Sequence, residues 1–164
     1  MSRDEEFTAY VAERRPHLYR AAYLLCGSTH RAEDLVQTAL TNLYVAWPRA
    51  QRAESVDAYV RRILVNSHLD ETRRPWRREQ VLGEPPERPA TPEPREEADD
   101  LWAALRGLPA GQRRVVVLRH YWGLSVAEAA ADLGVSTGTV KSQTSSALAT
   151  LRAALEPNPQ GGAR

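Results

Sequence analysis

The sequence has only one cysteine, Cys26, and no long apolar run. A single thiol cannot form an internal disulfide, and without a second cysteine nearby it cannot build a thiolate metal cluster. We therefore expect Cys26 to pack as a small buried hydrophobic residue, with a redox-sensing thiol as the alternative. No apolar stretch approaches the roughly 20 residues that cross a bilayer, and the N-terminus is polar and acidic. These absences predict a cytoplasmic protein without membrane insertion.

Signals of catalysis are missing as well. The sequence has no glycine-rich phosphate loop and no nucleophile elbow after a strand. Its histidines share no metal-ligand spacing; they are His17, His30, His68 and His120. We therefore expect no catalytic residue, no metal site, no cofactor and no small-molecule substrate.

The formal net charge of +1 at pH 7 is low for a protein that binds DNA alone. Unaided affinity for DNA comes largely from neutralising several phosphates. The charge is nevertheless polarised along the chain, because an arginine cluster (Arg61, Arg62, Arg73, Arg74, Arg77, Arg78) precedes an acidic one (Glu84, Glu87, Glu93, Glu96, Glu97, Asp99, Asp100). This pattern favours a protein that contacts DNA with the help of a partner.

Apolar residues at helical spacing predict three helices in the N-terminal part of the chain. The first begins after a capping box at Ser2 and ends at Gly27, with Pro16 expected to kink or interrupt it. The second runs from about Arg31 to Trp47, and the third follows a cap at Ser55. The segment 48–54 between them is polar and expected to be a turn. Residues 1–74 are therefore predicted to form a small three-helix bundle.

The segment 75–97 is rich in proline and acidic residues, and this composition predicts a flexible linker without a core. We expect a second helical domain over 98–156 and a frayed tail over 157–164. The predicted fold is all-α, with two small helical domains joined by the linker.

The second domain contains the pattern of a helix-turn-helix. Ser125 and Glu128 form a capping box before one helix, and Ser136 caps the next, from 137 to about 155. Ala130, Gly134 and Val140 supply the small contact residue, the turn residue and the apolar lock that two crossing helices need. The side chains expected to project outward are Thr137, Lys141, Ser142 and Ser145.

Five segments carry a resemblance to a known family. In the C-terminal part these are Leu108-Pro-Ala-Gly-Gln-Arg-Arg-Val-Val-Val-Leu-Arg119, Leu124-Ser-Val-Ala-Glu-Ala-Ala-Ala-Asp-Leu-Gly-Val-Ser136 and Thr139-Val-Lys-Ser142; in the N-terminal part they are Arg31-Ala-Glu-Asp-Leu-Val-Gln37 and Ala58-Tyr-Val-Arg-Arg-Ile-Leu-Val-Asn66. They resemble regions 4 and 2 of the group 4, or extracytoplasmic-function, sigma factors of bacterial RNA polymerase, in the sigma-70 superfamily. Two ordered blocks with a linker between them are more specific than a single helix-turn-helix.

The resemblance implies a protein that binds the clamp helices and flap of core RNA polymerase and directs promoter-specific initiation. It places polymerase contacts at Asp34, Gln37, Thr38 and Thr41. The minus 10 element would be read and melted by the segment from Trp47 to Ser55 and by the third helix, through Trp47, Arg49, Arg52, Tyr59, Arg62, Asn66, Arg73 and Arg74. Aromatic and basic residues suit the capture of unpaired bases. The minus 35 element would meet Ser136, Thr137, Thr139, Lys141, Ser142 and Ser145.

Several alternatives stay open at the level of sequence. An autonomous helix-turn-helix regulator that binds its operator without polymerase would share the C-terminal pattern, and a helical adaptor would lack DNA contacts altogether. Trp47 and Tyr59 could be ordinary core residues, because aromatic residues on helices often are. The acidic linker would thread the polymerase cleft and RNA exit path, or be a solvated tether. An anti-sigma factor is a candidate partner that the sequence leaves undecided.

Overall fold

A computed structural model describes residues 1–73 and 102–156 of the chain. Within these residues the regular secondary structure is entirely helical, and the chain divides into two compact units, Met1–Ala90 and Thr91–Arg164. The predicted all-α class with two helical parts is confirmed. The predicted linker and C-terminal tail lie outside the described residues.

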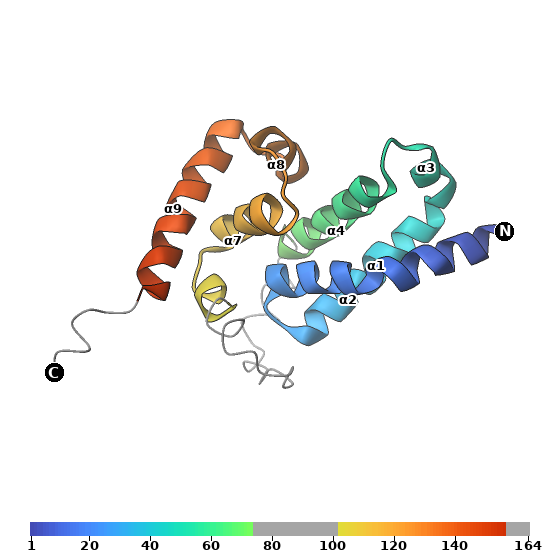
Figure 1. The fold of residues 1–164 in the computed structure, drawn as a ribbon, viewed down its shortest axis with the longest axis horizontal. Coiled ribbons are helices and arrows are strands. Elements are labelled where there is room, and N and C mark those ends of the chain that lie inside the picture. Colours follow the sequence, from blue (N-terminus) through green and yellow to red (C-terminus); the bar gives the residue numbers. More distant parts are fainter. Residues whose placement is uncertain (74–101, 157–164) are drawn as a thin grey trace. The chain divides into compact units, whose positions relative to one another are not determined.

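The first unit begins with α1, Arg3–Cys26, whose ends follow local sequence signals (Figure 1). The Ser2 side chain accepts a hydrogen bond from the Glu5 backbone, and Gly27 ends the helix with φ of 80°, in the left-handed region where glycine is favoured. The helix continues through Pro16, so the predicted interruption there is wrong. Proline removes one backbone bond, but the following residues bury Leu18, Ala21 and Leu25 against the rest of the bundle, which supports the continued helix.

Two further long helices complete the bundle: α2, Thr29–Val45, and α4, Val56–Arg73. Each packs against α1 and against the other (Figure 1). Their apolar stripes meet in a core that includes Leu35 and Leu43 of α2 and Leu64 of α4, all fully buried. Ser55 accepts a hydrogen bond from the Ala58 backbone at 3.1 Å, so the predicted cap of the third long helix is confirmed.

Between α2 and α4 the structure has a short helix, α3, Trp47–Arg52, where the sequence predicted a turn. Pro48 lies in its first turn, where a missing backbone N–H costs nothing. Trp47 and Ala50 face inward, and α3 contacts both α2 and α4. Over residues 1–73 the first unit is therefore a bundle of three long helices with a short fourth helix at the end where α1 begins (Figure 1).

The second unit contains α7, Ala110–Val116, α8, Val126–Leu133, and α9, Thr137–Leu155. Residues 102–106 are also helical. The helix predicted to run through Tyr121 changes register, because Val117–Tyr121 form a π-helical segment directly after α7. Leu118 in that segment and Val115 in α7 are fully buried, so the register change keeps both residues in the core. Both α7 and α8 pack on α9.

Candidate nucleic-acid interface

The outer face of α2 carries the four predicted polymerase contacts. Asp34, Gln37, Thr38 and Thr41 are all exposed, at spacings of three and four residues that place them on one side of the helix. Thr41 donates its hydroxyl to the Gln37 carbonyl at 2.8 Å, and Asp34 lies 3.6 Å from the His30 imidazole. The core residues of α2 occupy the opposite side. This face is therefore available to a partner without disturbing the bundle.

Sequence reasoning missed one residue of that face. Val45, four residues after Thr41, is 74% exposed at the end of α2. A single exposed apolar side chain is common on protein surfaces, so Val45 adds an apolar group to this face without marking a binding site by itself. The sequence alone could have placed Val45 on this face, because it follows Thr41 by four residues and Thr38 by seven, the spacing of one side of a helix.

Trp47 is 3% exposed, so the structure supports the core alternative for this residue. Its ring lies 5.4 Å from that of Phe7 and 5.5 Å from that of Tyr10, measured between centroids. The indole N–H is buried without a hydrogen-bond partner, so packing alone holds the side chain. In this conformation Trp47 supports α3 from the inside.

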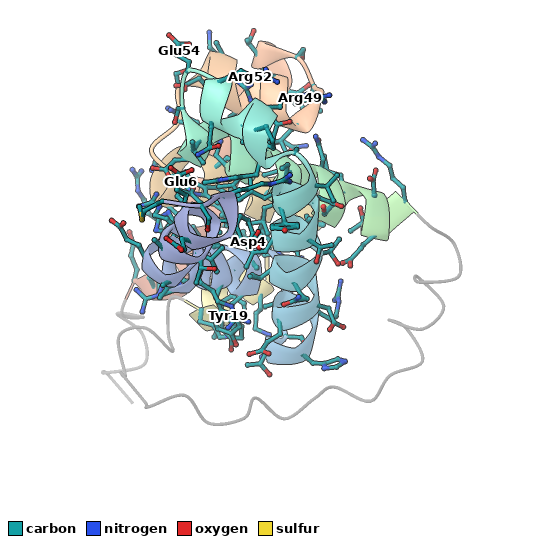
Figure 2. The ribbon with its side chains drawn as sticks, turned by 90° about the vertical axis from the view of Figure 1, so that its right-hand side faces the viewer. Asp4, Glu6, Tyr19, Arg49, Arg52 and Glu54 are labelled. Atoms are coloured by element: carbon teal, nitrogen blue, oxygen red, sulfur yellow. The ribbon has the colours of Figure 1, made fainter. Side chains whose placement is uncertain are left out.

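The two arginines of α3 lie on the outside. Arg49 and Arg52 are exposed in its last turn, and Figure 2 shows them at the end of the bundle, together with Glu54 in the turn that follows. The short helix therefore buries its aromatic residue and presents its cations.

The exposed side of α4 carries four more of the predicted residues. Arg62, Asn66 and Arg73 are exposed, and Tyr59 is half-buried; their spacing places all four on the side opposite to Leu64 and its buried neighbours. Arg74 lies outside the described residues. A side with cations, an amide and an aromatic ring can hold phosphates and stack unpaired bases.

The arginine cluster does not act as one surface. Arg61 is only 8% exposed, whereas Arg62 beside it is exposed. Successive helix residues are about 100° apart, so one side chain turns into the unit and the other out of it.

The second unit forms the predicted helix-turn-helix. Ser125 and Glu128 make both hydrogen bonds of a capping box, and Gly134 ends α8 with φ of 67°. Ala130 and Val140 are buried where α8 meets α9. The small contact, the turn and the lock predicted for these three positions are confirmed.

The predicted contact residues of α9 fall into two groups. Ser136 and Thr139 bond to each other, with 2.9 Å between their hydroxyl oxygens, and the Ser136 oxygen also accepts from the Thr139 backbone at 3.1 Å. Their hydroxyls therefore hold the start of α9. Lys141, Ser142 and Ser145 are exposed on its outer side, with Thr137 exposed in the first turn. Arg152, two turns after Ser145 on the same side, is an exposed cation that sequence reasoning missed.

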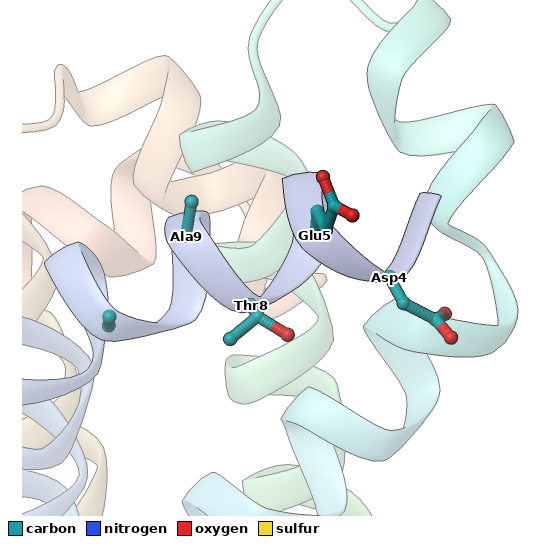
Figure 3. A pocket seen from close by; sticks show the side chains of 5 residues that line it. Asp4, Glu5, Thr8 and Ala9 are labelled. Atoms are coloured by element: carbon teal, nitrogen blue, oxygen red, sulfur yellow. The ribbon is translucent and has the colours of Figure 1, made fainter. Parts of the chain in front are cut away.

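An open depression on α1 carries no feature of a ligand site. It is lined by Asp4, Glu5, Thr8, Ala9 and Ala12 on one side of the helix (Figure 3). The carboxylates of Asp4 and Glu5 would repel an anion such as phosphate. In the two described ranges no cluster of three metal-ligating side chains occurs, and none of the described helices is long and apolar enough to cross a membrane.

Two family models match the chain. Residues 10–78 match sigma-70 region 2, and residues 98–151 match sigma-70 region 4. Together they span most of both units.

Individual relatives agree with this match. The RNA polymerase sigma-E factor of Streptomyces coelicolor is 40% identical over 154 residues, which cover 90% of this chain and 84% of that protein. The ECF RNA polymerase sigma factor SigL of Mycobacterium tuberculosis is 34% identical over 159 residues, 90% of this chain and 88% of the other. Among solved structures, the sigma factor RpoE of Bartonella quintana, co-crystallised with the anti-sigma factor NepR, superposes with a TM-score of 0.76 at 28% identity, covering 92% of this chain and 97% of that one.

Proposed function

The chain belongs to the sigma-70 family and to its extracytoplasmic-function group, and we propose that its two units divide promoter recognition between them. As a member of this family it is a sigma factor, which binds core RNA polymerase and directs promoter-specific transcription initiation. The observation that carries the proposal is that each unit combines one family region with an exposed polar or basic helix face.

In the first unit, which we assign to residues 1–74, α2 binds the clamp helices of the polymerase through Asp34, Gln37, Thr38 and Thr41. Val45 extends that contact with an exposed apolar side chain. Its burial by the partner would contribute favourable free energy to binding. The minus 10 element meets the exposed arginines of α3 and the outer side of α4. The residues assigned to it are Arg49, Arg52, Tyr59, Arg62, Asn66, Arg73 and Arg74.

In the second unit, which we assign to residues 98–156, the outer side of α9 enters the major groove at the minus 35 element. Lys141, Ser142 and Ser145 are exposed there, in the part of a recognition helix that reaches base edges and phosphates. Ser136 and Thr139 set the start of the helix, and Arg152 adds a phosphate contact further along. We assign residues 75–97 to a linker that runs along the polymerase and residues 157–164 to a tail.

This function requires no chemistry from the chain itself. We propose that the protein is not an enzyme and uses no cofactor or small-molecule substrate. It works in the cytoplasm, and on the nucleoid when bound to polymerase. The structural relative RpoE is bound by an anti-sigma factor, and we propose that a protein of this kind holds the present chain inactive by covering its polymerase-binding face.

In vitro transcription tests the proposal directly. Sigma-free core polymerase is supplied with a pool of genomic promoter fragments, with and without this protein, and the transcripts are mapped. Defined start sites that require the protein are the expected result. Binding of a duplex without polymerase, and no transcripts, would instead support the autonomous helix-turn-helix regulator.

A further inference from the structure

The start of α1 contacts α3 directly. Glu6 accepts a hydrogen bond from the Gln51 side chain, with 2.9 Å between Oε2 and Nε2. Phe7 places its ring edge-on to those of Tyr44 and Trp47, at centroid distances of 5.1 and 5.4 Å. Two neighbouring residues of α1 thus bind both ends of the short helix.

The end of α2, which leads into α3, is tied to the first turn of α1. The Tyr44 hydroxyl donates to Asp4 at 2.7 Å. Arg3 donates to the Tyr44 carbonyl at 2.6 Å, and its guanidinium lies 4.9 Å from the centre of the Tyr44 ring. The chain entering α3 is therefore held from both the backbone and the ring of one residue.

The start of α4, which follows α3, is tied to α1 as well. The Tyr10 hydroxyl donates to Asp57 at 2.7 Å, and Arg14 lies 3.1 Å from the same carboxylate oxygen. Burial, followed by the hydrogen bond to Asp57, raises the pKa of Tyr10 well above its usual value. Tyr10 therefore keeps its proton and donates this bond at any physiological pH.

The short helix depends on these contacts for its position. An isolated helix of six residues is unstable in water, and α3 has no side-chain cap at its N-terminus. It buries only Trp47 and Ala50, and the Trp47 indole N–H has no partner that would fix its direction. Its orientation therefore depends on α2 and α4, which it contacts, and on the packing and hydrogen bonds that α1 adds. In Figure 2 Asp4 and Glu6 mark the start of α1, and Arg49 and Arg52 mark α3.

We propose that residues 3–10 of α1, here called the N-terminal anchor, are positioning residues for the minus 10 element. They hold α3 so that Arg49 and Arg52 are presented to the DNA, without touching the DNA themselves. The inference rests on the proposed function of α3. Most of the anchor lies before the family match, which begins at residue 10.

The Glu6–Gln51 bond allows a donor–acceptor exchange as the test. Gln51→Glu places a second carboxylate against Glu6. The chain carrying both Gln51→Glu and Glu6→Gln has the same bond with donor and acceptor reversed. Each variant is assembled with core polymerase and assayed on a promoter mapped with the parent chain, and on copies with one base changed in the minus 10 or the minus 35 element.

Gln51→Glu is expected to lower initiation about threefold, as for an exposed charge pair, and to lower the discrimination against altered minus 10 bases. Discrimination at minus 35 stays unchanged. The double variant Gln51→Glu with Glu6→Gln is expected to restore both the initiation rate and the discrimination at minus 10. Because it keeps the new carboxylate on α3, its recovery distinguishes misplacement of α3 from repulsion of the DNA by that charge.

Leu18→Ala is the matched control, because Leu18 is a buried residue of α1 outside the anchor. It weakens the bundle but takes part in none of the anchor contacts described above, and is expected to leave the relative discrimination at minus 10 unchanged. The proposal is overturned if Gln51→Glu behaves as the parent, if the exchange fails to restore discrimination, or if Leu18→Ala changes discrimination in the same way. Failure of the proposed function itself would show earlier, as an absence of mapped start sites with the parent chain.

Discussion

Replacing Trp47 by alanine should destabilise the first unit rather than remove a DNA contact. The side chain is 3% exposed and packs on Phe7 and Tyr10, and truncation of a buried tryptophan costs about 3–5 kcal/mol. A unit of roughly 70 residues has a free energy of unfolding of about 4–11 kcal/mol. Trp47→Ala should therefore remove about half of the stability expected for a unit of this size.

The conservative change should behave differently. Trp47→Phe keeps an aromatic ring against Phe7 and Tyr10 and removes an indole N–H that has no partner. We expect a loss of about 1–2 kcal/mol, smaller than for alanine, because the phenyl ring keeps most of the packing but leaves a small cavity where the indole was larger. Hydrogen exchange in increasing urea, read by peptide mass spectrometry, measures this without DNA, and peptides from α8 and α9 serve as the internal control because that unit is unchanged.

One result would refute the argument about Trp47. Suppose that Trp47→Ala leaves the unfolding free energy of α1 to α4, measured by hydrogen exchange, within about 0.5 kcal/mol of the parent, while initiation from a mapped promoter is lost. The residue would then contribute through a base contact. The core assignment would then be wrong, and Trp47 would join the minus 10 surface.

Three further predictions concern single positions. Asp34→Arg on the exposed face of α2 should weaken binding to core polymerase about tenfold, measured by competition with the labelled parent chain. The unfolding free energy should change by less than about 0.5 kcal/mol. If the variant competes as well as the parent, this face is not the polymerase contact. Lys141→Ala should reduce the slope of log affinity against log salt for a minus 35 duplex, bound by the holoenzyme, by about 0.9, the value of one phosphate contact; an unchanged slope would assign Lys141 no phosphate. Gly134→Ala should destabilise the second unit by about 1 kcal/mol in thermal unfolding, because φ is 67° at this position. Gly138→Ala is the control, because its new Cβ would meet only the Ser136 side chain, at 3.8 Å. It should leave the stability equal or raise it by up to about 1 kcal/mol.

The features that the sequence predicted well are those with a local cause. Helix ends at Gly27 and Gly134, and the caps at Ser125 and Ser136, depend on residues within a few positions of one another. A hydrogen bond between neighbours in the chain forms in whatever fold surrounds it, so its signature can be found without knowing the tertiary structure.

The features that the sequence missed depend on distant contacts. The polar composition of segment 48–54 predicts a turn, and two helical turns are too short to show a period that would indicate a helix. It is helical over Trp47–Arg52 because Trp47 packs on residues of α1 about 40 positions earlier. Likewise, composition located the arginine cluster but not the phase that buries Arg61 and exposes Arg62.

Under the proposed function, the low net charge fits a chain whose two DNA contacts are each weak. The side of the first unit assigned to DNA presents Arg49, Arg52, Arg62 and Arg73, and α9 presents Lys141 and Arg152, so each of these two faces can neutralise only a few phosphates. Such contacts are weak alone at physiological salt. Once polymerase holds both units, the second DNA contact becomes intramolecular, and its effective concentration multiplies the affinity of the first. Weak units therefore leave the unbound chain with little hold on random DNA, and make recognition conditional on the polymerase that carries both.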